Sequence, residues 1–344
     1  MINNKSIIKS KTIIRDAIKI LDKSDIKNLI VEENKKIIGL FTEGDFRTAV
    51  LKGIDINSEI KNIVNKNFKY LKKNFTRKQI IQILKKNPRV HVIPVLNHNR
   101  SLIKIITREE FSNNIKKKYK NIDVVIMAGG QGKRLDPFTR ILPKPLVPIG
   151  ESTLLEKIVE KFSQSGLKSF FISLNDKKNL IKSYIKENLK NTNLKIVEEK
   201  NQLGTIGALK LFEKKISNFF FVTNCDVLID ANFKDIIDQH VQNKCDLTIV
   251  STFKNFSIPY GVFKVSKNGN LINFKEKPSV NQLVNCGLYL MNKKIIKYIP
   301  NNKKFDADQL IKILLKNKKK IKIFPISEFA WQDFGVWDEY FKNS

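Results

Sequence analysis

An apolar segment followed at once by closely spaced glycines constrains the fold of this chain more than any other feature. The stretch VVIMAGGQGKRLDPFTRILPKPLVPIG occupies residues 124–150. The chain contains 14 glycines in 344 residues, and Gly129, Gly130 and Gly132 fall within four positions of this stretch. A short apolar run bounded by glycine is typical of a fully buried strand. Because glycines let backbone N–H groups approach a ligand closely, the stretch predicts a strand that leads into a binding loop.

From residue 123 onward, apolar strand patterns alternate with amphipathic helix patterns. The predicted strands and helices lie, in chain order, at residues 123–130, 152–166, 169–175, 178–189, 194–199 and 219–229. Such alternation favours an α/β fold whose mixed, mainly parallel sheet carries helices on both faces. The Asn268–Gly269 pair predicts the turn of a β-hairpin. In these sheets ligands bind at the carboxyl ends of strands, where the glycines and the sequence NCD both fall.

The composition restricts the class of protein. No apolar stretch approaches the length of a membrane span, and the first residues lack a signal-peptide pattern, so we expect a cytoplasmic protein without a membrane partner. The three cysteines are isolated, which suits a reducing compartment, and the three histidines form no metal-ligand pattern. The net charge of +31 raises nucleic-acid binding as an alternative. We discount it because the lysines are scattered through the chain without interleaved aromatic residues.

The first 120 residues contain an internal repeat with an offset of 65 positions. Residues 31–46 align with residues 96–111, which pairs Thr42 with Thr107. Each copy alone is too small to bury an adequate core, so the two copies are expected to share one.

This half of the chain resembles a pair of cystathionine-β-synthase (CBS) motifs. The sequence GLFTEGDFR matches the family pattern G-x-x-T-x-x-D-x-R, at Gly39, Thr42, Asp45 and Arg47. In that family the threonine and aspartate hold an adenine nucleotide, which implies a regulatory nucleotide site at Thr42 and Asp45. The second copy has a degraded pattern, at Lys104, Thr107, Glu110 and Ser112. A purely structural module is the alternative, and because paired CBS modules commonly associate, a homo-oligomer is expected.

Two familiar phosphate-binding motifs do not fit the glycine loop. A Walker A loop requires glycine where Met127 stands and serine or threonine where Arg134 stands. The dinucleotide-binding pattern requires glycine where Leu135 stands. The loop still suits phosphates, because Arg134 can fork across their oxygens, Lys144 adds a point charge and three prolines stiffen the segment.

Residues 123–344 resemble the sugar-1-phosphate nucleotidyltransferase family, in motifs that follow the family's order. AGGQGKRLDPFT is similar to the nucleoside-triphosphate loop, although Lys133 stands where many members have threonine or serine. LGTIGAL is similar to the segment beside the base and sugar, at residues 203–209. YGVF, EKP and NCGLYLM resemble the sugar-phosphate side, at residues 260–263, 276–278 and 285–291. NCD and WQDFG match the positions of two magnesium carboxylates.

The resemblance implies a role for each matching residue. It implies nucleotide binding by Ala128, Gly129, Gly130, Gly132, Lys133, Arg134, Gly204 and Thr205. It implies sugar-phosphate binding by Gly261, Glu276, Lys277 and Asn285. It implies catalytic roles for Arg134, Lys144, Asp226 and Lys277. Magnesium would be held by Asp226 and Asp333, and only the fold can bring these two distant residues together.

The chemistry of such a transfer agrees with these residue types. Joining a nucleoside triphosphate to a sugar 1-phosphate brings two polyanions together, so positioning and charge neutralisation dominate. Two carboxylates suit Mg²⁺, which takes few protein ligands. We therefore expect an enzyme that releases pyrophosphate and makes a nucleotide sugar for surface-glycan or nonulosonic-acid synthesis. The resemblance favours GTP with glucosamine 1-phosphate or mannose 1-phosphate; uridylyl, thymidylyl or cytidylyl transfer and a non-catalytic nucleotide-sugar sensor stay open.

The two resemblances together divide the chain. We expect CBS motif 1 at residues 1–58, CBS motif 2 at 59–118, a basic linker at 119–122 and the catalytic domain at 123–344. The expected fold class is α/β, a Rossmann-like nucleotide-diphospho-sugar transferase fold preceded by a CBS-pair (Bateman) module.

Overall fold

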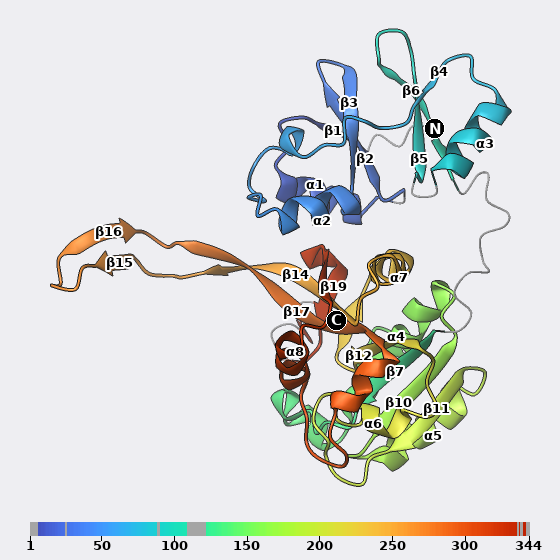
Figure 1. Ribbon diagram of the computed structural model, residues 1–344, viewed down its shortest axis with the longest axis vertical. Coiled ribbons are helices and arrows are strands. Elements are labelled where there is room, and N and C mark those ends of the chain that lie inside the picture. Colours follow the sequence, from blue (N-terminus) through green and yellow to red (C-terminus); the bar gives the residue numbers. More distant parts are fainter. Residues whose placement is uncertain are drawn as a thin grey trace. The chain divides into compact units, whose positions relative to one another are not determined.

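The computed structural model describes residues 6–24, 26–87, 90–108, 122–335, 337, 340 and 341. The chain divides into two compact units, Met1–Lys118 and Tyr119–Ser344 (Figure 1). Residues 119–121 of the expected linker lie outside the described residues, as do Glu110 and Ser112 of the second CBS copy. Within the described ranges, no helix is both long enough and apolar enough to span a membrane.

The first unit contains two copies of one small fold. In the first copy β1 (Ile7–Lys9) pairs parallel with β2 (Asn28–Glu33), which pairs antiparallel with β3 (Lys36–Thr42). The second copy repeats this order and these directions, in β4 (Leu71–Lys72), β5 (Val92–Leu96) and β6 (Leu102–Thr107). Among the described residues of the unit, the α-helices are α1 (Ile14–Asp22), α2 (Glu43–Leu51) and α3 (Arg77–Lys86). The internal repeat predicted from the sequence is therefore confirmed.

The two copies share a hydrophobic cluster, beside another cluster that belongs to the second copy alone. Ile30, Ile37 and Leu40 from the first copy cluster with Phe68 and Leu96 from the second. Because neither copy is large enough to bury a sufficient core alone, this shared cluster makes the pair the stable unit, as expected.

The second unit is built on a seven-stranded sheet in the order β11-β10-β7-β12-β17-β14-β18. Four neighbouring strands run parallel: β11 (Asn193–Glu198), β10 (Ser169–Leu174), β7 (Asp123–Ala128) and β12 (Phe219–Asn224). The remaining three are β17 (Ser279–Asn292), antiparallel to its neighbours, β14 (Leu247–Ser257), and β18 (Ile321–Ile326), parallel to β14. The mixed, mainly parallel sheet is confirmed.

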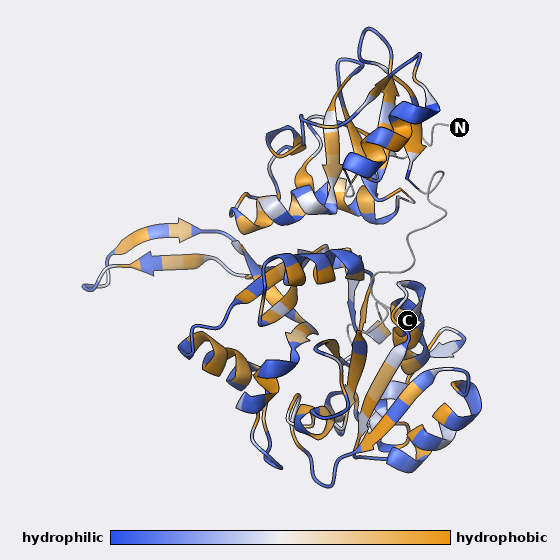
Figure 2. Cartoon of the chain, turned by 45° about the vertical axis from the view of Figure 1, so that its right-hand side comes forward, coloured by the Kyte–Doolittle hydropathy of each residue, from blue (hydrophilic) through white to orange (hydrophobic). Residues whose placement is uncertain are grey.

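Helices cover both faces of this sheet, as predicted. One hydrophobic cluster receives side chains from α4 (Leu154–Gln164), α5 (Lys178–Asn188) and α7 (Phe233–Gln242). The other receives side chains from α6 (Leu209–Phe212) and α8 (Ala307–Lys316). Figure 2 shows strands of the sheet mainly in the hydrophobic colour, which agrees with burial on both faces.

Two short ribbons lie outside the main sheet. They are β8 (Pro148–Ile149) with β9 (Ser152–Thr153), and β13 (Val227–Ile229) with β19 (Trp331–Asp333). The strand predicted at residues 219–229 is in fact two strands, β12 and β13, which belong to different sheets. The break falls at Cys225 and Asp226, so that aspartate stands at a strand end rather than within a strand.

A long β-ribbon, which we call the arm, extends beyond the other strands of the sheet (Figure 1). The arm comprises residues 253–283: the outer parts of β14 and β17 and, at its tip, the hairpin of β15 (Val262–Val265) and β16 (Leu271–Lys275). The predicted turn joins the two hairpin strands, and its Gly269 has φ +80°, a conformation that favours glycine.

Candidate active site

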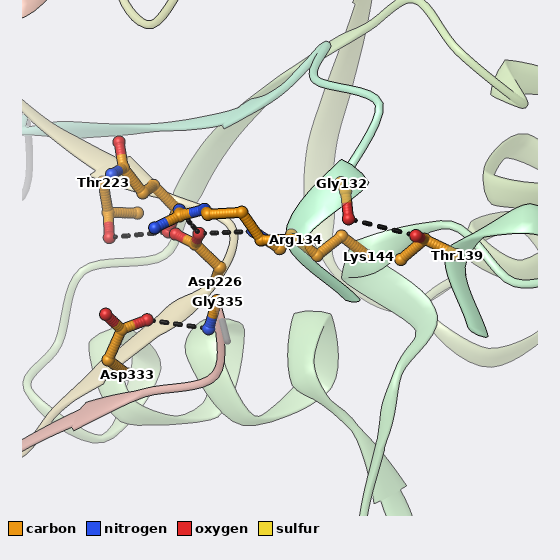
Figure 3. Close-up of polar contacts among 9 residues, drawn as sticks. Gly132, Arg134, Thr139, Lys144, Thr223, Asp226, Asp333 and Gly335 are labelled. Atoms are coloured by element: carbon orange, nitrogen blue, oxygen red, sulfur yellow. Dashed lines mark hydrogen bonds and ion pairs between the residues drawn. The ribbon is translucent and has the colours of Figure 1, made fainter. Parts of the chain in front are cut away.

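The glycine loop leaves β7 at Ala128 and folds back on itself. It contains three short 3₁₀ turns, η4 (Lys133–Leu135), η5 (Phe138–Arg140) and η6 (Lys144–Leu146). The Thr139 hydroxyl donates a hydrogen bond of 3.0 Å to the carbonyl oxygen of Gly132 (Figure 3). Gly132 has φ +70°, and a Cβ there would lie 3.0 Å from Thr139 Cγ2, so glycine lets the loop close in this way. The closure brings Arg134 and Lys144 toward one point.

That point is Asp226, which follows β12 at the carboxyl end of the strand. Because β12 and β7 are parallel neighbours, the glycine loop and Asp226 lie at the same edge of the sheet. Lys144 Nζ lies 2.7 Å from Asp226 Oδ2, and the two residues are 8% and 7% exposed. Arg134 Nη2 lies 3.4 Å from the same oxygen, but its side chain is 62% exposed (Figure 3). The buried lysine therefore holds the carboxylate, while the guanidinium is open to an approaching ligand.

The β13–β19 ribbon brings Asp333 to the same place. Val227, which follows Asp226 directly, lies opposite Asp333 in the antiparallel register. The backbone N–H of Phe334 donates a hydrogen bond of 2.8 Å to the carbonyl oxygen of Asp226. The backbone N–H of Gly335 donates one of 2.7 Å to Asp333 Oδ1. The structure thus joins two residues that are far apart in the chain.

The carboxylates of Asp226 and Asp333 approach each other around Gly335. A Cβ on Gly335 would lie 2.8 Å from Asp226 Oδ2 and 2.8 Å from Asp333 Oδ1, so both oxygens face one small space. Burial raises the pKa of Asp333, and the negative charge of Asp226 adds to the rise against the hydrogen bond from Gly335. Such a pair favours a cation nearby. No group of three or more His, Cys, Asp or Glu side chains suited to a metal occurs among the described residues, so this site would offer two protein carboxylates.

Glu199 is a further carboxylate at this edge, and the sequence analysis did not identify it. The residue is 3% exposed, and its Oε1 has no hydrogen-bond partner within the described ranges. A Cβ on Gly129 would lie 2.2 Å from that oxygen, so the missing side chain of Gly129 makes room for the carboxylate. Burial raises the pKa of Glu199. An unpaired buried acceptor is costly, which makes Glu199 a candidate for ligand binding.

The other predicted nucleotide-binding residues of the loop surround these groups. Ala128 is buried as the last residue of β7, and Lys133 begins η4. No atom lies within 4 Å of a Cβ placed on Gly130, so this part of the loop surface is open to a ligand. The two glycines therefore differ in purpose: Gly129 accommodates Glu199, whereas Gly130 leaves open space.

The segment with Gly204 and Thr205 is held between Glu199 and the start of α8. The Leu203 N–H donates a hydrogen bond of 3.2 Å to Glu199 Oε2, and the Thr205 N–H donates one of 2.8 Å to Asp306 Oδ1. Gly204 has φ +80°, and a Cβ there would lie 2.7 Å from Asp306 Oδ1, so this position requires glycine. The segment forms a wall beside the buried carboxylate.

Among the residues predicted to bind the sugar phosphate, Asn285 lies close to the site. Its Oδ1 accepts a hydrogen bond of 3.0 Å from the Gly287 N–H. A Cβ on Gly287 would lie 2.7 Å from Asn224 Nδ2, so this part of β17 packs directly on the residue two positions before Asp226.

The other three predicted sugar-phosphate residues lie on the arm. A Cβ on Gly261 would lie 2.6 Å from the Phe274 ring and 3.0 Å from Glu276 Oε2, so these groups are neighbours there. Lys277 follows with φ +43°, at the point where the chain turns into β17. These residues are therefore grouped on the arm, which extends away from β12 and β19, the strands next to Asp226 and Asp333 (Figure 1).

In the first unit, Thr42 and Asp45 form the N-terminal cap of α2. The Thr42 hydroxyl and backbone N–H donate hydrogen bonds of 2.7 and 2.9 Å to Asp45 Oδ2, and the Asp45 N–H donates one of 3.3 Å to Thr42 Oγ1. Burial raises the pKa of Asp45. This reciprocal capping box gives both residues a structural role at the start of α2.

Residues 123–344 match the family model described as nucleotidyl transferase. The chain belongs to the nucleotidyl transferase family. Residues 2–52 and 60–117 match the CBS domain model. The nucleotidyl transferase match includes the seven-stranded sheet, the arm and every residue of the cluster around Asp226, while the CBS matches fall on the two copies in the first unit.

The relatives of this nucleotidyl transferase differ in the share of their own length that this chain covers. The bifunctional protein GlmU of Methanococcus aeolicus is 30% identical over 63% of this chain, which spans 52% of that relative, about half its length. The D-glycero-alpha-D-manno-heptose 1-phosphate guanylyltransferase of Campylobacter jejuni is 29% identical over 64% of this chain and 97% of its own length. The crystal structure of HddC from Yersinia pseudotuberculosis complexed with GMP-PN matches with a TM-score of 0.51, at 29% identity, over 64% of this chain and 97% of that one.

Proposed function

We propose that this chain transfers the guanylyl group of GTP to a sugar 1-phosphate in a magnesium-dependent reaction. The sugar phosphate is of the glucosamine 1-phosphate or mannose 1-phosphate type, and the products are pyrophosphate and a GDP-sugar used in the cytoplasm for surface-glycan or nonulosonic-acid synthesis. The observation that carries the proposal is the convergence of Arg134 and Lys144 on Asp226, with Asp333 beside it. This cluster combines a cation site with basic groups for phosphates.

The reaction is a displacement at the α-phosphorus of GTP. A phosphate oxygen of the sugar 1-phosphate forms a bond to that phosphorus, the bond to the bridging oxygen breaks, and the electron pair leaves with pyrophosphate. Arg134 is exposed, so its planar guanidinium can meet the phosphate oxygens on which charge develops. Lys144 holds Asp226 in place through the buried ion pair and adds positive charge to the site.

We propose that Asn285, which lies beside this cluster, contacts the sugar. The roles proposed for Lys277 at the attacking phosphate and for Gly261 and Glu276 at the sugar require the arm to approach the cluster, because these three residues lie on the arm, apart from Asp226.

Asp226 and Asp333 fit a magnesium ion. An oxygen of each lies 2.8 Å from one common point, the position of a Cβ on Gly335, and Arg134 Nη2 lies 3.1 Å from the same point, so a positive charge already faces both carboxylates. Hard carboxylate oxygens and a small number of protein ligands match the preference of Mg²⁺. When bound, the ion would neutralise and orient the phosphates.

Glu199 supports guanine as the base. A carboxylate only accepts hydrogen bonds, and among the common bases guanine presents two adjacent donors, the ring N–H and the exocyclic amine, on its pairing edge. Uracil and thymine present one N–H between two carbonyls, while adenine and cytosine place an acceptor nitrogen beside their amine. A buried acceptor without a partner, as at Glu199 Oε1, disfavours a base that cannot donate to it.

The names of the relatives agree with this proposal. The Campylobacter relative is named as a guanylyltransferase, and the Yersinia structure contains GMP-PN. In each of these two comparisons, 64% of this chain covers 97% of the other protein. We therefore propose that residues 123–344 are the catalytic domain, with residues 119–122 linking it to CBS motifs at 1–58 and 59–118. These motifs would act as a regulatory module that binds an adenine nucleotide at Thr42 and Asp45.

Pyrophosphate release by the purified full chain with Mg²⁺ tests the proposal. GTP, UTP, dTTP, CTP and ATP would be crossed with the 1-phosphates of glucose, mannose, glucosamine, N-acetylglucosamine and heptose. We expect release with GTP, and loss of release in Asp226→Asn. If no pair of nucleotide and sugar phosphate releases pyrophosphate while GDP-sugars still bind, the non-catalytic sensor would be favoured instead.

The variant Glu199→Gln tests the base. It keeps the shape of the side chain but replaces one acceptor oxygen by a donor amide, so kcat/KM for GTP should fall about 100-fold or more while activity with UTP or dTTP rises. An unchanged preference for GTP would contradict the role of Glu199 without contradicting nucleotidyl transfer itself.

A further inference from the structure

Lys177 reaches the glycine loop from another part of the second unit. It lies between β10 and α5, and because β10 and β7 are parallel neighbours, it stands at the same edge of the sheet as the loop. Its Nζ donates a hydrogen bond to the carbonyl oxygen of Thr139, in the η5 turn of the loop. Lys177 belongs to none of the motifs identified in the sequence, so only the fold creates this contact.

The position of Lys177 is locally unfavourable in two ways. Its φ of +46° lies in the left-handed region, which residues other than glycine seldom adopt. It is also the N-cap of α5 and makes no capping hydrogen bond with its side chain, at a helix end where the dipole disfavours a cation. Costs of this kind persist where the surrounding structure compensates for them, and they are common at functional sites. The hydrogen bond to Thr139 is such a compensation.

Thr139 connects Lys177 to the part of the loop that carries Arg134. The buried Thr139 holds the Gly132 carbonyl oxygen through its hydroxyl, in the 3.0 Å hydrogen bond described above (Figure 3). Gly132 stands two positions before Arg134, the exposed guanidinium of the site. A shift of Thr139 would therefore move the loop backbone beside Arg134.

The same turn is held from a second side. The indole N–H of Trp337 donates a hydrogen bond of 3.1 Å to the carbonyl oxygen of Asp136. Within the turn, the Asp136 carboxylate accepts hydrogen bonds of 2.6 and 2.7 Å from Arg140. These bonds lower the pKa of Asp136, and the positive charge of Lys177 adds to the effect. Two donors from outside the loop, Lys177 and Trp337, thus fix one short turn.

We propose that Lys177 is a positioning residue for nucleotide binding, because its hydrogen bond to the Thr139 carbonyl fixes the glycine loop in the conformation that receives the triphosphate. This inference rests on the proposed nucleotidyl transfer, and it gives Lys177 no contact with the substrates. A loop without this bond would have to be ordered when the nucleotide binds, which weakens binding. Lys177 therefore lowers KM for GTP and takes no part in the displacement itself.

The variant Lys177→Met removes the donor, and Lys178→Met is its matched control. Lys178 Nζ lies 2.8 Å from Glu198 Oε2, so this neighbouring lysine forms its ion pair with β11 and not with the loop. A lost hydrogen bond from a charged group should raise KM for GTP roughly tenfold in Lys177→Met. KM for the sugar 1-phosphate and the melting temperature should change little.

Lys178→Met should keep the wild-type KM for GTP, and Lys177→Arg, which keeps a charged donor, should recover most of the loss. An unchanged KM for GTP in Lys177→Met would overturn the proposal. Equal rises in both KM values, with a lower melting temperature, would also overturn it, in favour of a general structural role.

A double variant distinguishes an effect through Thr139 from a direct contact between Lys177 and the triphosphate. Thr139→Val removes the hydroxyl that holds Gly132. If Lys177 acts through Thr139, adding Lys177→Met to Thr139→Val should raise KM for GTP little further, because both changes break one chain of contacts. Independent effects that multiply would overturn the proposal and favour a direct contact.

Hydrogen exchange of the full chain without substrates separates this inference from the proposed function. We expect the backbone N–H groups of residues 129–142 to exchange faster in Lys177→Met than in the wild type or in Lys178→Met. Unchanged exchange would overturn the role of Lys177 even if the wild type transfers a nucleotide. Faster exchange in a protein whose wild type transfers none would contradict the proposed function but support the positioning of the loop by Lys177.

Discussion

Variants of the buried ion pair between Lys144 and Asp226 can separate an effect on the free energy of unfolding from an effect on activity. The variant Lys144→Met removes the ammonium and leaves a carboxylate that is 7% exposed. Removal of one partner of a buried pair costs about 3 to 5 kcal/mol, because the remaining charge is uncompensated. We expect the lower end of this range, since Arg134 stays 3.4 Å from the same oxygen but is 62% exposed and compensates only in part.

The double variant Lys144→Met with Asp226→Asn should recover most of this stability. It leaves no buried charge at either position, so we expect a free energy of unfolding within about 1 kcal/mol of the wild type. It should nevertheless release no pyrophosphate, because both the metal carboxylate and the buried cation are absent.

Urea unfolding followed by tryptophan fluorescence measures these differences. Both tryptophans, Trp331 and Trp337, belong to the second unit, so the signal reports the unit that contains the ion pair. A double variant as unstable as Lys144→Met would refute the argument that an uncompensated charge causes the loss. A double variant with wild-type activity would refute the catalytic role of Asp226.

Further perturbations address the metal site, the loop, the core and the CBS unit. Gly335→Ala places a methyl group 2.8 Å from both carboxylates, so we expect a higher Mg²⁺ requirement in a magnesium titration of activity; an unchanged requirement would count against the site. Trp337→Phe removes the 3.1 Å hydrogen bond to the Asp136 carbonyl in the glycine loop, so KM for GTP should rise several-fold while the melting temperature changes little. Burial lowers the pKa of His240 to about 4, so the folded state holds the imidazole in its neutral form. Because the unfolded chain binds the proton at higher pH, the free energy of unfolding should fall by about 3 kcal/mol as the pH drops from 6.5 to 4. Urea titrations should show this loss in the wild type and a much smaller loss in His240→Gln. Asp45→Ala removes a capping box, which costs about 1 kcal/mol, and should abolish any response of activity to AMP and ATP; a retained response would place the sensor elsewhere.

Local sequence pattern was enough to predict several of the elements and their order, although one predicted strand, at 219–229, is two strands. The strand predicted at 169–175 is β10, the helix predicted at 178–189 is α5, and both agree to within one residue. The alignment of residues 31–46 with 96–111 likewise predicted two copies of one fold. These features are readable because strand alternation and helical periodicity depend on residues that are close in the chain.

Proximity and burial were decided by the tertiary structure. Glu198 and Glu199 stand side by side at the end of β11, yet Glu198 is exposed and pairs with Lys178, while Glu199 is 3% exposed beneath Gly129. Nothing in the local pattern distinguishes the two, so the sequence analysis missed the one that faces the loop. Only the packing of a distant loop over β11 makes one of them a buried acceptor.

The same reason applies to the metal site and to the arm. The family resemblance named Asp226 and Asp333, but their meeting depends on the pairing of β13 with β19. The Asn268–Gly269 turn predicted a hairpin, but it did not predict that the hairpin would project from the sheet with many of its hydrophobic side chains exposed. The sequence alone determined which segments form strands and helices, because local backbone geometry sets their periodicity. Which side chains meet and which are buried was decided by the pairing and packing of segments far apart in the chain.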